Sequence, residues 1–315
     1  DLFSLLAGDS YQIMSLAKAL KNLGVDVKIT TELMEDLEGF DLVHCFNMLR
    51  ANSCLRQCKW FRKNNMYTIL TPIYWDLSEY LRNYSPERLN FWYSEEKTRQ
   101  EILNLVDYLA PNAENEFLLM KRNFKFNLPY SYVYNGVEEE FLSEKEYFSK
   151  KYILSVGRIH PRKNQLNMIK AVKGLNKPVL FIGRINDRNY YRRCKEEADQ
   201  NVNFIEEIPR DQLKNYYNKS RVHLMVSWYD TPGLVNLEAG LAGSNLLITD
   251  RGTTQDYFQN FAYYSSPLDI NDIRKKIKIA YSIPPKNKLQ KIILEKYTWN
   301  KIASKSKKIY EDIIN

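Results

Sequence analysis

Short apolar runs alternate with segments of helical periodicity along most of this 315-residue chain. Apolar runs that predict buried strands lie at 42–45, 152–156, 179–182, 202–205, 222–226 and 245–249. Helical patterns that separate or flank them lie at 11–23, 52–64, 165–172, 190–199, 211–217 and 234–242. This alternation is typical of a parallel sheet covered by helices. The sequence therefore predicts an α/β fold.

The chain is long enough for two such domains, each with its own core. Further expected elements are strands at 25–30, 67–70, 108–110 and 132–134, a long helix at 87–105 and a last helix over the final 20 residues. Between 138 and 151 the chain is charged and has no period, which is typical of a linker. We therefore expect a first domain at 1–140 and a second at 150–295.

Composition excludes several classes of protein. Hydrophobic residues make up 44% and charged residues 27%, as in globular domains. No run of 18 apolar residues predicts a spanning helix, and no secretory signal is visible. The chain begins with Asp1, so we expect a trimmed N-terminus. The four cysteines are too sparse for a disulfide framework, and the pair Cys54 and Cys58 has no histidine at ligand spacing, which favours a reducing, cytoplasmic setting without a structural metal.

Positive charge is concentrated in the second half. Residues 1–140 hold 15 Lys and Arg against 20 Asp and Glu, whereas the remainder holds 31 against 18. A basic half indicates nucleic acid, an anionic membrane surface or a phosphorylated ligand, or else a solvated Lys-rich surface. No helix-turn-helix, zinc or RNA-binding signature supports nucleic acid. Peripheral association with the inner face of a membrane remains a hypothesis based on charge alone.

The segment 227–238 follows a buried strand and opens a helix. Pro232 stands where a first helical residue is expected, and Gly233 allows a ligand to approach the backbone closely. The N–H groups of Gly233, Leu234 and Val235 would then form an anion site at the end of the sheet where ligands bind. Glu238 lies about one turn further along an apolar helix, where it needs partners. Ribose hydroxyls would suit its carboxylate, and so would a Lys or Arg side chain.

The segment 157–164 also follows a strand and precedes a helix. Arg158 leaves the strand end after Gly157, and Lys163 comes five residues later. Two cations at the C-terminal end of a strand suit a diphosphate, although an ordinary basic turn has the same pattern.

Taken together, these motifs resemble the retaining glycosyltransferases of family 4, which have the GT-B fold of two Rossmann-like domains facing across a cleft. The resemblance rests on Gly157, Arg158, Lys163 and Asn164; on acidic Asp230 and Glu238 around Gly233-Leu234-Val235; on Asn135-Gly136-Val137-Glu138; and on Tyr297-Thr298-Trp299 before a last helix. In the family that helix, here 298–315, crosses back onto the first domain. The resemblance covers most of the chain and is strongest over 130–260.

The resemblance implies a retaining transfer of sugar from a nucleotide-diphosphate sugar to a glycan or lipid-linked glycan precursor, without a metal or other cofactor. Arg158 and Lys163 would stabilise the departing diphosphate. Asp230 would contact the sugar near the anomeric centre, and Glu238 the ribose. Donor binding would also involve Gly157, Gly233, Leu234, Val235 and Gly8, the last in the segment Ala7-Gly8-Asp9-Ser10 ahead of the first helix.

Two departures from the family pattern matter. Asp230 stands where Glu is usual. No His occupies the segment 71–76. His44 ends a different strand, where a histidine can also simply belong to the core. In the segment 71–76, Tyr74, Trp75 and Asp76 could bind an acceptor sugar. The two aromatic residues could equally belong to the core. The alternatives to a transferase are therefore a catalytically inactive GT-B nucleotide-binding subunit and a related GT-B epimerase or phosphorylase, the latter disfavoured by the ribose carboxylate.

Overall fold

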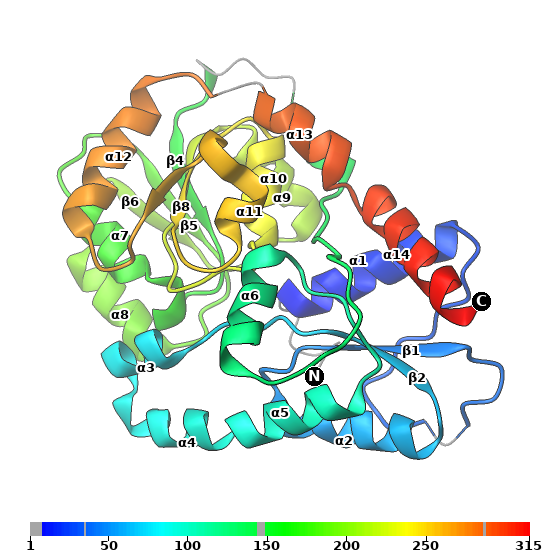
Figure 1. The fold of residues 1–315 in the computed structure, drawn as a ribbon. Coiled ribbons are helices and arrows are strands. Elements are labelled where there is room, and N and C mark those ends of the chain that lie inside the picture. The colour runs from blue at the N-terminus through cyan, green and yellow to red at the C-terminus, as the bar shows by residue number, and fades with distance from the viewer. Residues whose placement is uncertain (1–7, 35, 144–148, 286–287) are drawn as a thin grey trace. The chain divides into compact units, whose positions relative to one another are not determined.

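The computed structural model describes residues 8–34, 36–143, 149–285 and 288–315 (Figure 1). It divides into two compact units, Asp1–Gly136 with Trp299–Asn315, and Val137–Thr298. Each unit contains a parallel sheet, so the predicted α/β class is confirmed.

The first unit is built on the parallel sheet β1-β2-β3. Helix α2 packs against α5 beside this sheet, and α1 packs against α14, which joins this unit from the far end of the chain. Its elements are α1 (Gly8–Asn22), β1 (Leu42–Phe46), α2 (Ala51–Lys63), β2 (Tyr67–Thr71), α3 (Ser78–Tyr84), η1 (Pro86–Arg88), α4 (Leu89–Ser94), α5 (Glu96–Leu105), β3 (Tyr108–Leu109), α6 (Glu114–Asn123) and α14 (Trp299–Ile314).

The second unit is built on the parallel sheet β6-β5-β4-β7-β8-β9. Helix α7 packs against both α8 and α12, and α10 packs on α13 (Figure 1). Its elements are η2 (Glu139–Phe141), β4 (Tyr152–Val156), η4 (Pro161–Lys163), α7 (Gln165–Val172), β5 (Val179–Ile182), α8 (Arg188–Glu197), β6 (Val202–Ile205), α9 (Arg210–Tyr217), β7 (Ser220–Met225), α10 (Leu234–Leu241), β8 (Asn245–Thr249), α11 (Thr254–Phe258), η5 (Gln259–Phe261), β9 (Tyr263–Ser265), α12 (Ile270–Ser282) and α13 (Lys288–Lys296).

The order of these strands places a topological switch between β4 and β7. From β4 the chain proceeds outward through β5 and β6, then returns to β7 and proceeds the other way through β8 and β9. Almost every residue of β4, β7 and β8 is buried, as in strands covered on both faces. The loops that follow the C-terminal ends of β4 and β7 therefore start side by side and lead away in opposite directions. Open α/β sheets bind ligands at this point.

Two predicted strands are wrong. Residues 25–30 follow Gly24, whose left-handed backbone (φ 79°) ends α1 as expected, but they form no strand. Polar Asp26 and Lys28 alternate there with half-buried residues, and no described strand pairs with them. Residues 132–134 are extended but carry only isolated backbone contacts, such as the Val133 N–H to the Pro111 carbonyl at 2.9 Å. Apolar alternation was present in each case, but a partner strand was not.

Most predicted helices agree with the structure within one or two residues, and two in the first unit differ by more. The helix expected at 87–105 is divided into η1, α4 and α5, with a break at Glu95. Helix α1 begins at Gly8, three residues before the expected start, so Gly8 and the residues after it belong to the helix rather than to a loop ahead of it. Asp9 lies in the first turn, where an acidic side chain interacts favourably with the helix dipole.

The first domain was predicted to end at 140, but residues 137–140 belong to the second unit. Val137 pairs with Thr298 in a parallel bridge, and the buried ring of Phe141 meets Tyr217 edge-on at 5.7 Å between centroids. The apolar residues among the charged ones thus anchor this segment. Residues 144–148 of the expected linker lie outside the described part of the chain.

Among the described residues, no helix combines the length and the apolar character that crossing a bilayer requires.

Candidate functional site

The loop after β4 brings Lys163 to the sheet edge. Gly157 leaves the strand with little space, because a Cβ there would lie 3.2 Å from Met225 Cε. Residues Pro161–Lys163 form one 3-10 turn, and Asn164 then takes a left-handed conformation (φ 59°) before α7 begins. The Asn164 amide donates to the carbonyls of Val226 and Pro267, at 2.9 and 2.8 Å. This amide fixes the β4 loop to the loop after β7.

The loop after β7 brings Asp230 to the same edge. Lys163 Nζ lies 2.6 Å from Asp230 Oδ1, and the Ser227 hydroxyl donates to Asp230 Oδ2 at 2.5 Å. The side chains of Lys163 and Asp230 are only 12% and 5% exposed. Burial lowers the pKa of the Lys163 ammonium, and the nearby Asp230 opposes that shift. Two of the three predicted catalytic residues therefore form an almost completely buried ion pair.

Helix α10 begins at Leu234, as the helical pattern 234–242 predicted, but Pro232 is not its first residue. Gly233, with φ 86°, is the N-cap, so the helix begins two residues after Pro232. Positive φ interrupts helical geometry, so the helix can start only after Gly233. A Cβ at Gly233 would also lie 3.2 Å from Asp230 Cγ. The N–H groups of Leu234 and Val235 belong to the first turn of α10, where the helix itself provides no acceptors.

Glu238 lies in the middle of α10 and is fully buried. Its Oε1 accepts from the Arg210 guanidinium and its Oε2 accepts from the Tyr217 hydroxyl at 2.9 Å. The partner of this carboxylate in the structure is thus an arginine, one of the two kinds of partner that the sequence allowed. Burial, followed by the charge of Glu238, raises the pKa of Tyr217 well above its usual value, so the hydroxyl remains a donor.

Arg210 and Tyr217 were not among the predicted site residues. They lie at the two ends of α9, which precedes β7. The sequence predicted a helix at 211–217 between two strands, and this order places α9 beside the sheet. Which of its side chains reach α10 depends on packing that the spacing did not reveal.

The third predicted catalytic residue, Arg158, lies next to Gly157 in the β4 loop and is half-buried. Its carbonyl accepts from the Gln165 amide at 2.8 Å. The charge of Arg158 contributes to lowering the pKa of Lys163, as does that of Arg162. The Arg162 guanidinium in turn stands 4.7 Å from the ring centre of Tyr229. Three cations therefore come from the eight residues after β4.

In the first unit, Tyr74 belongs to the core. It is 1% exposed, its ring meets Phe124 at 5.2 Å, and its hydroxyl accepts from the Asn123 amide at 2.9 Å. This is the core alternative rather than an acceptor contact. Trp75 and Asp76 are half-buried, and Asp76 accepts from the Ser78 N–H at the start of α3.

His44 is also a satisfied structural residue. Its two ring nitrogens lie 2.7 Å from the Tyr310 hydroxyl and 2.8 Å from the Thr71 hydroxyl, and burial lowers its pKa to about 3. Over the described ranges, no three His, Cys, Asp or Glu side chains converge as a metal site would require. Gly8 opens α1, with no other group within 4 Å of the position that its Cβ would occupy.

Residues 137–299, slightly more than half of the chain, match the family model described as "Glycosyl transferases group 1". The chain belongs to this family. The matched residues include every predicted site residue of the second unit, from Gly157 to Glu238.

Curated members of the family are similar to this chain over part of their length. It is 25% identical over 160 residues to the O-antigen chain mannosyltransferase RfbU of Salmonella typhimurium, covering 49% of this chain and 45% of that protein. It is 30% identical over 129 residues to the human GDP-Man:Man(3)GlcNAc(2)-PP-Dol alpha-1,2-mannosyltransferase, covering 35% and 26%. The chain thus spans half or less of the length of both of these relatives.

Solved glycosyltransferases establish the fold. Anabaena HepE in complex with UDP and glucose matches with a TM-score of 0.77 at 11% identity, over 99% of this chain and 98% of that one. Sucrose-phosphate synthase from Thermosynechococcus elongatus matches with a TM-score of 0.74 at 17% identity, over 88% and 74%. The predicted GT-B fold class is confirmed.

Proposed function

We propose that the protein is a retaining glycosyltransferase that moves a sugar from a nucleotide-diphosphate sugar to a glycan or lipid-linked glycan acceptor. The observation that carries the proposal is the Lys163–Asp230 pair at the switch between β4 and β7, beside the first turn of α10. Family membership supports the reaction class. The HepE complexes contain UDP or UDP-glucose, which supports a nucleotide-sugar donor.

In this proposal the diphosphate lies against the N-terminus of α10. The N–H groups of Gly233, Leu234 and Val235 bind its oxygens, and Arg158 and Lys163 offset the charge that develops as the nucleotide leaves. Asp230 is then free to accept from sugar hydroxyls, because Lys163 turns to the phosphate. Because these hydrogen-bond donors are in place before the reaction, they stabilise the developing negative charge without having to reorganise. In this proposal the reaction therefore needs no metal.

Glu238 binds the donor ribose in this proposal. A carboxylate has about four lone-pair sites, and Arg210 and Tyr217 use two of them. Because Glu238 is fully buried, the Arg210 side chain must move before ribose hydroxyls can reach it. The amide of Gly8 is assigned to the donor as well, and Trp75 and Asp76 to the acceptor.

The acceptor class is supported by the names of the two curated mannosyltransferases, one for O-antigen chains and one for a dolichol-linked glycan. A cytoplasmic setting is supported by four free, buried cysteines. Contact with an anionic membrane is supported by the basic second half. Binding to phosphatidylglycerol liposomes at low salt tests the last point, and equal recovery with neutral liposomes would contradict it.

A panel of UDP, GDP, ADP and CMP tests the donor site through thermal stability, first without metal and then with Mg²⁺. A nucleotide present at ~100 times its dissociation constant adds about 2.7 kcal/mol to the unfolding free energy. We expect one diphosphate to stabilise the protein without Mg²⁺, and Lys163→Ala to abolish the effect. Lys170→Ala, on the exposed side of α7, is the matched control.

Turnover separates the transferase from an inactive nucleotide-binding subunit. The diphosphate that stabilises the protein identifies which nucleotide sugars to incubate with it, and release of that diphosphate is then measured. Release that depends on Lys163 supports the transferase. Stabilisation without release over many hours, with every common sugar on that nucleotide, would favour the inactive subunit. If none of the nucleotides stabilises the protein, the donor-site proposal is wrong.

A further inference from the structure

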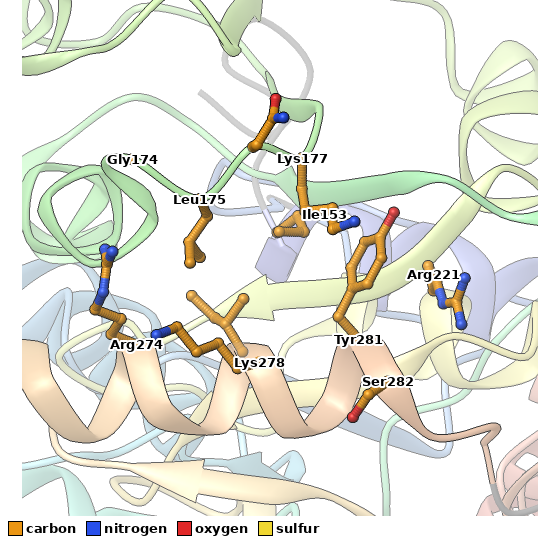
Figure 2. Close-up of a pocket in the computed structure, with 11 residues that line it drawn as sticks. Ile153, Gly174, Leu175, Lys177, Arg221, Arg274, Lys278, Tyr281 and Ser282 are labelled. Atoms are coloured by element: carbon orange, nitrogen blue, oxygen red, sulfur yellow. The ribbon is translucent and has the colours of Figure 1, made fainter.

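A basic hollow lies at the end of the second-unit sheet where β4, β5 and β7 begin. It has a volume of about 670 Å³. Its wall includes Ile153 near the start of β4, Arg221 near the start of β7 and Lys177 just before β5 (Figure 2). The Lys163–Asp230 pair follows the C-terminal ends of the same strands, so this hollow is separate from the proposed donor site.

The hollow is lined by four cationic side chains, Lys177, Arg221, Arg274 and Lys278. None of the described residues that line it is Asp or Glu. Figure 2 shows Arg274 and Lys278 on one turn of α12, with Leu175 above them and Tyr281 further along the helix. The residues therefore combine positive charge with an apolar surface.

Tyr281 connects two of these cations. Its ring centre lies 5.0 Å from Lys177 Nζ and 4.7 Å from the guanidinium carbon of Arg221. Its hydroxyl donates to the Lys151 carbonyl at 2.9 Å, which fixes the ring. The ring thus holds two cations from different parts of the chain, Lys177 just before β5 and Arg221 near the start of β7.

Helix ends account for only part of this charge. Helices α7 and α12 have their C-termini at this end of the sheet, and each C-terminus carries roughly half a negative charge. Arg274 caps the C-terminus of α7, because its guanidinium donates to the carbonyls of Ala171 and Lys173. Two helix ends together carry roughly one negative charge, whereas four of the described residues that line the hollow are cationic.

We infer that this hollow is a second anion site, which binds a small ligand carrying two or more phosphate groups on an apolar or ring-shaped body. The volume lies in the usual range for small-molecule sites. Guanidinium and ammonium groups suit phosphate oxygens. Ile153, Leu175 and the Tyr281 ring form the surface for the apolar body. The phosphates can belong to a soluble ligand or to a lipid headgroup.

The test compares two double variants that remove the same charge. Lys177→Ala/Lys278→Ala removes two exposed cations of the hollow, whereas Lys170→Ala/Lys275→Ala removes two exposed lysines of α7 and α12 that do not line it. Inorganic pyrophosphate is titrated by calorimetry into the wild type and both variants. We expect the first variant to bind at least about tenfold more weakly and the second to bind as the wild type does.

Arg158→Ala is titrated as well, because pyrophosphate could instead bind the proposed donor loop. If affinity falls in Arg158→Ala and not in Lys177→Ala/Lys278→Ala, the anion binds at the donor loop and the inference is overturned. Equal weakening in both double variants, which would indicate general surface charge, also overturns it. Neither result depends on whether the protein transfers sugar.

Vesicles distinguish the two sources of phosphate. Co-sedimentation with phosphatidylglycerol and with phosphatidylcholine vesicles is measured for the same two double variants. Loss of phosphatidylglycerol binding in Lys177→Ala/Lys278→Ala alone supports a lipid headgroup as the ligand. Pyrophosphate binding without such a difference supports a soluble ligand. If neither probe distinguishes the two variants, the inference is wrong.

Discussion

Lys163 Nζ lies 2.6 Å from Asp230 Oδ1 although 67 positions separate the residues in the chain. Strand β4 lies beside β7, and this adjacency brings their loops together. The pair is nearly buried, so each charge depends on the other. The contact is therefore both a structural element and the centre of the proposed donor site.

Lys163→Met and Asp230→Asn should each destabilise the protein by roughly 3–5 kcal/mol, since each leaves a buried charge unpaired. The double variant should lose less than the sum, with a coupling energy of about 1–3 kcal/mol. Urea unfolding measures both quantities. The exposed pair Lys173–Glu197, at 2.9 Å, is the control, for which we expect about 0–1 kcal/mol. Similar coupling energies in the two pairs would show that burial does not strengthen the Lys163–Asp230 interaction.

Arg210→Met should also destabilise the second unit, because it removes the cation that faces fully buried Glu238. The Arg210 side chain is 24% exposed, so we expect a loss near the lower end of ~3–5 kcal/mol. Arg210→Met/Glu238→Leu removes both charges and should recover most of the stability. Chemical denaturation measures both variants. A double variant no more stable than Arg210→Met would mean that packing, not charge, causes the loss.

Gly252→Ala should destabilise the protein and weaken nucleotide binding together. Gly252 has φ 88°, and its Cβ would lie 1.9 Å from the carbonyl oxygen of Asp230, so the Asp230 backbone must move. Gly39→Ala is the control, because Gly39 has φ 81° with nothing within 4 Å. We expect only the conformational cost of about 1 kcal/mol there. Thermal unfolding and nucleotide titration check this prediction, and equal losses in the two variants would contradict it.

His44 and His223 should stay neutral at mildly acidic pH. Burial lowers their pKa values to about 3 and about 4. In the unfolded chain both titrate near 6.5, so the unfolded chain binds more protons between pH 6.5 and these values. Above pH 6.5 these two histidines therefore do not reduce the free energy of unfolding. Below pH 6.5 that free energy falls as the pH drops, by about 1.4 kcal/mol per pH unit for each histidine.

NMR checks this prediction directly. The imidazole signals of His44 and His223, assigned with His44→Gln and His223→Gln, should not shift between pH 8 and 5. Titration of either ring near pH 6.5 in the folded protein would contradict the prediction. The fall in stability from pH 7 to 5 should also be smaller in each variant than in the wild type.

The strands of the second sheet show what could be predicted locally. The apolar runs at 179–182, 202–205 and 245–249 are the observed β5, β6 and β8 without a change of boundary. Every residue of β5 and β8 is buried, so these runs could be recognised without knowing their neighbours, whereas β6 lies at the lateral edge of the sheet and carries the exposed Asn203 within its apolar run. Strand β9, Tyr263–Ser265, was missed because it has only three residues, two half-buried tyrosines and a buried serine, at the lateral edge of the sheet.

The sequence by itself determined the α/β class, the two-domain organisation and the family motifs around Gly157 and Gly233, since these depend on periodicity and on backbone angles set within a few residues. Only the tertiary structure decided that Asp230 pairs with Lys163, that Glu238 pairs with Arg210, that Tyr74 is a core residue and that four cations surround one hollow. These contacts depend on strand order and on helix packing. Spacing along the chain does not encode either, because the partners come from elements that become neighbours only when the sheet assembles.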